Sequence, residues 1–125
     1  MKDKTILIVE DDPQNLKLFR DILRHKGYMT LEATDGQQGV AMAKMYKPDL
    51  ILMDMQLPVM DGIEATNMIK RDITTKDTVV VALTASAMPG DREKILSAGC
   101  HDYISKPVHL LEFLRKIAGY LDETE

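Results

Sequence analysis

Short apolar runs alternate with amphipathic stretches from end to end of this chain. The first run, Thr5–Val9, is apolar after its threonine, which is typical of a strand that is covered on both faces of a sheet. Residues 29–33, 50–53, 78–83 and 101–104 are the other expected strands. Because strands joined by helices run parallel through right-handed crossovers, the pattern predicts an α/β fold, (βα)₅, with helices on both faces of a doubly wound parallel sheet.

The stretches between the runs carry helix start and stop signals. Asp12 and Pro13 suit an N-cap and a first helical position, and Gly27 suits the end of that helix. Asp61 with Glu64 three residues later is typical of a capping box. The remaining helices are expected over 36–46, from 61 to 71, between Pro89 and Gly99, and along an apolar stripe of Leu110, Leu114, Ile117, Ala118 and Leu121.

Length and composition limit the classes of protein that the chain can be. Its 125 residues suit one domain, 1–125, that is long enough to bury a core. No apolar run approaches the roughly 18 residues of a membrane span, and the N-terminus lacks the apolar stretch of a signal peptide. The formal net charge of −4 argues against nonspecific nucleic-acid binding, and the single Cys100 excludes an internal disulfide. These features predict a soluble, cytoplasmic protein.

Polar residues follow four of the expected strands, where the functional site of an open parallel sheet lies. Glu10 and Asp11 follow the first strand, Asp54 the third, Thr84 the fourth and Lys106 the fifth. Crowded carboxylates must bind a cation, shift their pKa values or pair with a lysine. Since the candidate ligands are hard oxygens with no His or Cys nearby in sequence, the set favours Mg²⁺.

This constellation predicts phosphoryl transfer to a carboxylate. Asp54 is the expected nucleophile, which would attack phosphorus and form an acyl phosphate. Lys106 offers a point charge to the phosphoryl oxygens, and the Thr84 hydroxyl offers them a hydrogen-bond donor. Asp12 is expected to cap a helix and is not counted as a metal ligand.

Four stretches of the chain resemble the receiver domains of two-component response regulators. They are Ile-Val-Glu10-Asp11-Asp, the run from Asp49 to Gly62, Ala-Leu-Thr84-Ala, and Tyr103-Ile-Ser-Lys106-Pro. The resemblance spans the whole chain with the order and spacing of the motifs kept, and the set is highly specific although each motif alone is not. It implies a flavodoxin-like sheet with strand order 2-1-3-4-5.

The resemblance also implies a phosphoryl donor and a metal site. The donor is a phosphohistidine on a histidine kinase or a histidine phosphotransfer protein, and the acceptor is Asp54. Mg²⁺ is expected on the side chains of Asp11 and Asp54 and on the main-chain carbonyl of Gln56, with Glu10 acting through water. The chain is therefore expected to catalyse only its own phosphorylation and dephosphorylation, and not to be an enzyme in the usual sense.

The resemblance implies a switch as well. Thr84 and Tyr103 are the expected switch pair, and the bond between Lys106 and Pro107 is expected to be cis. Phosphorylation would change the face formed by the fourth helix, the fifth strand and the fifth helix, through which a downstream protein target would bind. Gln56 and Ser86, two residues beyond Asp54 and Thr84, are expected to control the access of water to phosphorus.

Two architectures stay open at this point. The lack of an output domain and the stretch from Glu10 to Phe19 are similar to stand-alone, single-domain regulators of cell division. Other stretches also resemble receivers attached to hybrid histidine kinases, so a receiver domain excised from a hybrid kinase or a larger regulator is the alternative.

Three other functions compete with this interpretation. A phosphatase with an aspartate nucleophile needs a second acid two residues on, where this chain has Gln56. A flavin-binding module needs a phosphate-cradling loop after the first strand, where this chain has the acidic run 10–12. An adaptor that keeps only the fold would not need Asp54 or Lys106.

Overall fold

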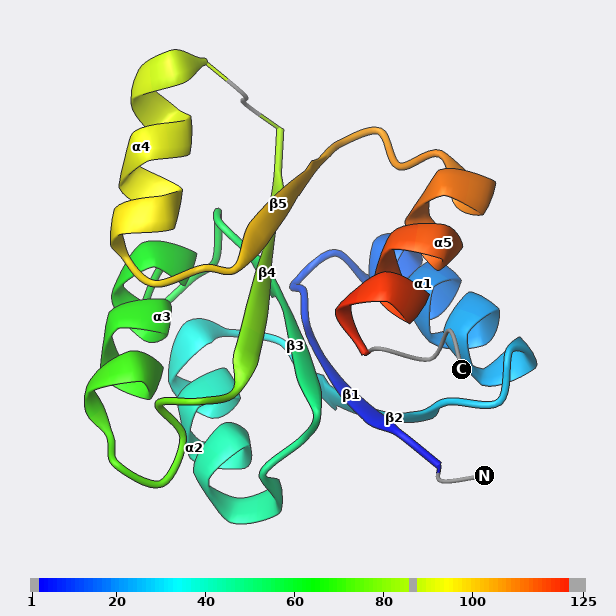
Figure 1. Cartoon of the computed structure of the whole chain (residues 1–125), viewed down its shortest axis with the longest axis horizontal. Coiled ribbons are helices and arrows are strands. Elements are labelled where there is room, and N and C mark those ends of the chain that lie inside the picture. Colours follow the sequence, from blue (N-terminus) through cyan, green and yellow to red (C-terminus); the bar gives the residue numbers. More distant parts are fainter. Residues whose placement is uncertain (1–2, 86–87, 122–125) are drawn as a thin grey trace.

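The computed structural model describes residues 3–85 and 88–121, and a five-stranded parallel sheet with strand order β2-β1-β3-β4-β5 lies at its centre (Figure 1). The strands are β1 (Thr5–Val9), β2 (Met29–Ala33), β3 (Leu50–Asp54), β4 (Val79–Thr84) and β5 (Asp102–Ser105). The flavodoxin-like order 2-1-3-4-5 is therefore confirmed. The strands β3, β4 and β5 end one residue later than predicted, so Asp54 and Thr84 are the last residues of their strands.

Helices cover both faces of the sheet. They are α1 (Pro13–His25), α2 (Gly36–Tyr46), α3 (Gly62–Arg71), α4 (Pro89–Ser97) and α5 (Leu110–Tyr120). The helices α1 and α5 lie on one face, and α2, α3 and α4 lie on the other (Figure 1). Leu7 and Val9 of β1 pack toward the second group, while Ile6 and Ile8 pack toward the first. This two-sided burial explains the unbroken apolar run, and each such side chain stabilises the fold by roughly 1.5–3 kcal/mol.

Local signals in the sequence set the ends of the helices. The Asp12 Oδ1 atom accepts a hydrogen bond from the Gln14 backbone N–H at 3.0 Å, so Asp12 is the N-cap of α1, as predicted. The Asp61 Oδ1 atom accepts one from the Glu64 N–H at 2.9 Å and caps α3 in the same way. Beyond α4, Gly99 has a φ of +110°, in the left-handed region that favours glycine, and it ends that helix.

The buried stripe of α5 differs from the predicted one. Leu110 is 49% exposed, whereas Phe113, which the prediction omitted, is 1% exposed. The Phe113 ring stacks on Phe19 of α1, with 5.5 Å between the ring centroids. Phe113, Ile117 and Leu121, spaced four residues apart, form the buried face. Two neighbouring stripes of α5 are apolar, and the contact with α1 decides which of them is buried.

The edge strand β5 is joined to the end of α5 by a polar contact. The Tyr120 hydroxyl donates a hydrogen bond to Asp102 Oδ2 at 2.5 Å. The other oxygen of this carboxylate, Oδ1, accepts the Tyr103 backbone N–H at 2.8 Å. His101 packs edge-on against the Tyr120 ring, with 5.6 Å between the centroids. The Asp102 side chain therefore links α5 to the sheet and also satisfies the Tyr103 backbone N–H of β5.

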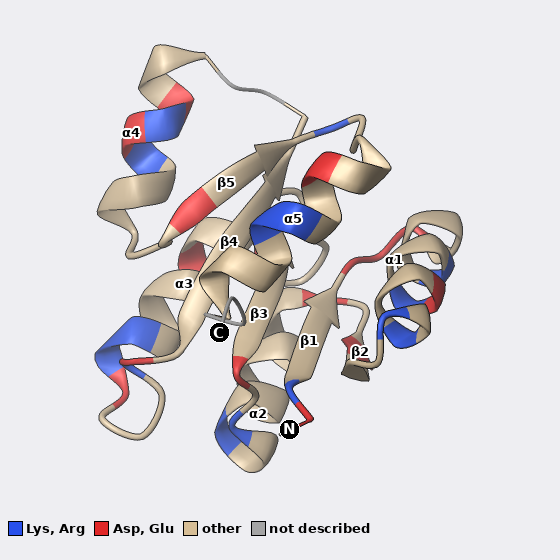
Figure 2. Cartoon of the chain, turned by 45° about the vertical axis from the view of Figure 1, so that its right-hand side comes forward, with Lys and Arg blue, Asp and Glu red and all other residues tan. Residues whose placement is uncertain are grey.

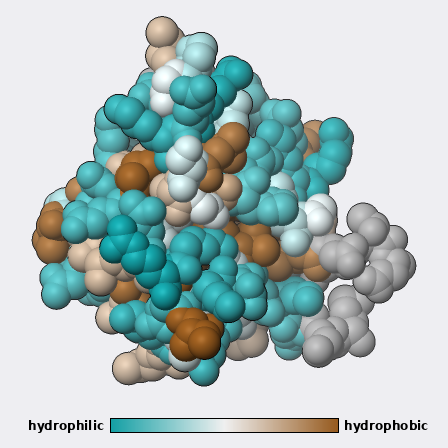
Figure 3. Space-filling view, turned by 60° about the vertical axis from the view of Figure 1, so that its left-hand side comes forward, coloured by the Kyte–Doolittle hydropathy of each residue, from teal (hydrophilic) through white to brown (hydrophobic). Residues whose placement is uncertain are grey.

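Charged residues lie mainly on helices and loops, and the strands carry few of them (Figure 2). Hydrophilic residues cover most of the face seen in Figure 3, with separate apolar patches between them, which is ordinary for a protein surface. Among the described residues, no helix combines the length and the apolar character that a bilayer span requires. Glu10 and Asp54 are the exceptions among the described carboxylates, because they are buried, and both lie at the carboxyl edge of the sheet.

Candidate functional site

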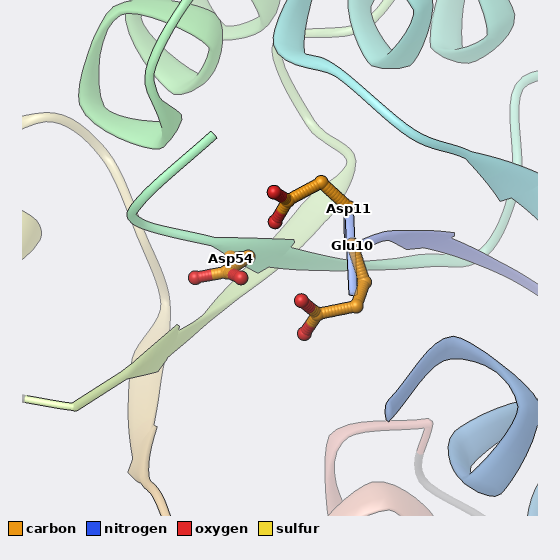
Figure 4. A group of neighbouring side chains, drawn as sticks. All are labelled: Glu10, Asp11 and Asp54. Atoms are coloured by element: carbon orange, nitrogen blue, oxygen red, sulfur yellow. The ribbon is translucent and has the colours of Figure 1, made fainter. Parts of the chain in front are cut away.

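Three carboxylates meet where β1 and β3 end (Figure 4). Glu10 and Asp11 directly follow β1, and Asp54 is the last residue of β3. One oxygen from each of the three side chains lies within 4.8 Å of the others, and the three groups surround a common space. The predicted convergence of these acids is therefore found in the structure.

Lys106 directly follows β5, two strands along from β3, and reaches the cluster at the same carboxyl edge of the sheet. Its Nζ atom lies 3.1 Å from Glu10 Oε1 and 3.1 Å from Asp54 Oδ2. The Lys106 backbone N–H donates to the Thr84 carbonyl at 2.8 Å, which fixes the lysine beside the end of β4. The bond between Lys106 and Pro107 is cis, as the resemblance implied. Lys106 is 96 positions from Glu10 and 52 positions from Asp54 in the sequence, and the fold joins the three side chains in one ionic network.

Burial dominates the electrostatics of the cluster. Glu10 is 1% exposed and Asp54 is 5% exposed, whereas Asp11 is exposed to solvent. Burial, with the hydrogen bond and the charge of Asp54, raises the pKa of Glu10 to about 7 although Lys106 opposes this. For Lys106, burial disfavours the charge, but the bonds to Glu10 and Asp54 outweigh it and hold the pKa above its usual value.

The charges and the ligand types of the cluster fit a divalent cation. The one ammonium group of Lys106 faces two carboxylates, and the ion pairs of the described residues include none with Asp11. The donors are carboxylate oxygens, which Mg²⁺ prefers, and soft or nitrogen ligands are absent from this group. The chain's own residues therefore suit Mg²⁺ better than zinc or another soft-ligand metal.

The loop after β3 supports Asp54 closely. The Gln56 backbone N–H donates to Asp54 Oδ1 at 3.1 Å, so both oxygens of the carboxylate have partners. Gly62 begins α3 so near this point that an added Cβ would lie 2.3 Å from the Asp54 carbonyl oxygen. Only a residue without a side chain fits there, and α3 can therefore start against the end of β3.

Thr84 and Tyr103 lie on neighbouring strands beside the cluster. Thr84 is the last residue of β4 and is 5% exposed. Tyr103 in β5 pairs with Ala82 of β4, and its half-buried side chain packs toward the core on the side of α2, α3 and α4. The switch role of this pair stays a prediction, as does the carbonyl ligand from Gln56. Ser86 lies outside the described residues.

Two features of the site were not foreseen. Val59, in the loop between β3 and α3, has a φ of +69°, which is uncommon for a β-branched residue. The Arg92 guanidinium of α4 lies over the Tyr103 ring, with Cζ 5.6 Å from the centroid. The sequence holds no signal for Val59, because valine does not favour this conformation, and none for Arg92, because the contact depends on how α4 packs.

Fold and site together define a class of protein: a flavodoxin-like α/β domain with an acidic, metal-compatible pocket and a lysine at the carboxyl edge of its sheet. The response regulator receiver domain family matches residues 6–118. The chain belongs to this family, which acts in two-component signalling, and membership implies interaction with kinases or phosphotransfer proteins.

Individual relatives agree with this assignment. The chain is 43% identical over 120 residues to the polar-differentiation response regulator DivK of Brucella anthropi, and the match covers 96% of this chain and 98% of that protein. The receiver domain of sensor histidine kinase PA1611 from Pseudomonas aeruginosa, solved with a magnesium ion coordinated in its active site cleft, is 39% identical. It superposes with a TM-score of 0.90 over 97% of this chain and 99% of that one. A CheY-like receiver domain protein from Methanospirillum hungatei is 32% identical, with a TM-score of 0.90 over 98% and 96% of the two chains.

Proposed function

We propose that this chain accepts a phosphoryl group on Asp54 from a phosphohistidine of a histidine kinase or a histidine phosphotransfer protein. The observation that carries the proposal is the position of Lys106 Nζ, 3.1 Å from both Asp54 Oδ2 and Glu10 Oε1, within a cluster of three carboxylates. A buried nucleophile held beside a fixed cation suits the transfer of an anionic group.

In the proposed step, an Asp54 carboxylate oxygen forms a bond to phosphorus as the bond from phosphorus to the donor imidazole nitrogen breaks. The electron pair of the broken bond returns to the imidazole. Lys106 remains protonated throughout, because its pKa is held above the usual value, and it turns its charge toward the phosphoryl oxygens. The Thr84 hydroxyl would donate a hydrogen bond to one of these oxygens.

Glu10, Asp11 and Asp54 would hold Mg²⁺ in this proposal, with the main-chain carbonyl of Gln56 as a further ligand. When bound, Mg²⁺ neutralises negative charge on the carboxylates and on the phosphoryl oxygens. Glu10 is 1% exposed and Asp11 is exposed, so the first acts from inside the pocket and the second from its rim.

We infer that the phosphorylated chain passes on its signal by binding another protein. A phosphoryl group adds roughly −1.5 to −2 charges at Asp54, to which Thr84 and Tyr103 respond. The face formed by α4, β5 and α5 carries a groove of about 450 Å³, which Tyr103, Lys106 and Phe113 help to line. A downstream protein would read this face, in the cytoplasm and without direct contact to nucleic acid or membrane.

Two architectures remain as candidates. The near full-length match to DivK of Brucella anthropi supports a stand-alone regulator that consists of one receiver domain, 1–125. The match to the receiver of a sensor histidine kinase from Pseudomonas aeruginosa supports the alternative, a receiver that belongs to a hybrid kinase or a larger regulator.

Incubation with acetyl phosphate and Mg²⁺, followed by intact-mass measurement, tests the proposal. The wild-type chain should gain one phosphoryl group, and Asp54→Asn should gain none. Asp61→Asn is the matched control, because it also removes an acid near the site but leaves a good helix cap, and it should be labelled normally. Labelling of the Asp54 variant, or labelling that ignores chelation of Mg²⁺, would contradict the assignment.

A further inference from the structure

The Tyr103 ring is covered from one side by a single cationic side chain. Arg92 projects from α4, and its Cζ atom lies 5.6 Å from the ring centroid. This distance falls inside the roughly 6 Å range in which a guanidinium is attracted by the face of an aromatic ring. The contact joins α4 to β5 at the residue that the proposed switch would move.

Packing does not force this contact. Arg92 is exposed, and the ion pairs of the described residues include none that involves it. Arg92 and Tyr103 both border the 450 Å³ groove between α4 and α5, so the guanidinium has open space beside it. Attraction to the ring therefore explains its position better than steric confinement does.

The contact accompanies a site in which the Lys106 ammonium binds Asp54 Oδ2 and Glu10 Oε1 directly, each at 3.1 Å. A phosphoryl group on Asp54 would compete for this ammonium in the proposed function, so the direct pairing corresponds to the unmodified arrangement. A contact that is made in one state of a two-state element and lost in the other biases the equilibrium toward the first. Movement of the ring away from α4 would weaken this contact.

We propose that Arg92 is a positioning residue that holds Tyr103 in its unmodified orientation and so lowers the response of the switch to phosphorylation. This inference rests on the proposed function, because it concerns the same switch. By linkage, whatever favours the unmodified orientation weakens the binding of any ligand that favours the other one, by the same factor. An exposed contact of this kind corresponds to about a two- to fivefold change in that equilibrium.

The test uses the full chain labelled with 3-fluorotyrosine, with the Tyr103 signal assigned by Tyr103→Phe. Fluorine NMR reports the ring environment without ligand, and a titration with beryllofluoride and Mg²⁺ reports the affinity for a phosphoryl mimic. In Arg92→Ala the Tyr103 signal should shift before any addition, and beryllofluoride should bind about two- to fivefold more tightly. Arg92→Lys should give a Tyr103 signal and a beryllofluoride affinity between those of the wild type and Arg92→Ala, because the lysine ammonium keeps the charge but lacks the planar face of the guanidinium.

Lys116→Ala is the matched control, since Lys116 borders the same groove from α5 and should change neither readout. A purely structural role for Arg92 would change the melting temperature and leave the beryllofluoride affinity alone. An unmoved Tyr103 signal in Arg92→Ala, or an affinity that is equal or weaker, overturns the inference. A wild-type chain that binds no beryllofluoride overturns the proposed function instead. The two failures are distinguishable, because the second is seen in the wild-type titration alone.

Discussion

Two buried carboxylates, Glu10 and Asp54, share one ammonium group at the centre of this site. Removing the ammonium leaves the two carboxylates in a poorly hydrated place, where they must repel each other or take up a proton, and either outcome costs stability. Single residues therefore determine both the stability and the chemistry of the pocket, and the consequences can be measured one substitution at a time.

Lys106→Met should lower the free energy of unfolding by roughly 1–3 kcal/mol at neutral pH, because the lysine is partly exposed and water screens some of the loss. Added Mg²⁺ should recover part of this loss, since it supplies positive charge to the same carboxylates. Urea unfolding with and without Mg²⁺ measures both effects. Lys76→Met, which removes an exposed lysine from the loop after α3, should have little effect, and an equal loss in the two variants would contradict the expectation.

Val59 carries backbone strain next to the site. Its φ of +69° is costly for a β-branched residue, and its side chain is 76% exposed, so little packing is lost on replacement. Val59→Asn should therefore raise the free energy of unfolding by roughly 0.5–2 kcal/mol, because asparagine tolerates this region. Val59→Ala should raise the free energy of unfolding by less than Val59→Asn does. Urea unfolding checks both variants, and a less stable asparagine variant would show that the valine is not strained.

At the scale of helices and strands, the contact between Tyr120 and Asp102 fastens α5 to β5. Burial and this hydrogen bond raise the pKa of Tyr120 above its ordinary value. The folded chain therefore keeps the Tyr120 proton to a higher pH than the unfolded chain does. The resulting stability is fully present below a pH of about 10 and is lost as the pH rises further, by up to about 1.4 kcal/mol per pH unit.

Tyr120→Phe should lower the free energy of unfolding by roughly 1–2 kcal/mol at pH 8, because it removes a hydrogen bond to a carboxylate. The gap between this variant and the wild type should narrow above pH 10, where the wild type loses the contribution of Tyr120. Urea unfolding at pH 8 and pH 10.5 measures the gap. Tyr46→Phe, at an exposed position at the end of α2, is the control, and a gap that does not change with pH would refute the linkage.

The same scale shows why most elements could be predicted from the sequence. Asp12 and Asp61 cap their helices through neighbours two and three residues away, so the signal is local. The buried stripe of α5 could not be predicted, because Phe113 is selected by Phe19 on another helix. At the site, the residue types at the strand ends predicted the cluster. The direct bonds of Lys106 to Glu10 and Asp54 could not be predicted, because they depend on how a long side chain is placed in three dimensions, which no local pattern specifies.

The whole molecule should respond to Mg²⁺ as a folded-state ligand. A ligand that binds only the folded chain stabilises it, by about 2.7 kcal/mol at a hundred times its Kd. Mg²⁺ should therefore raise the melting temperature. Asp11→Asn should lose most of the gain, because one of the three clustered carboxylates is removed. Asp12→Asn, which keeps the helix cap, should retain the gain, and the reverse order of the two variants would disprove the ligand assignment.

The lysine bridge also affects how the chain behaves before any signal arrives. Lys106 supplies an internal counter-ion to Glu10 and Asp54, the two buried acids among the described residues, so their approach is balanced in part by a charge of the chain itself. If the cluster binds Mg²⁺ as proposed, folding of the chain and loading of the ion should be separate events, the first independent of the second.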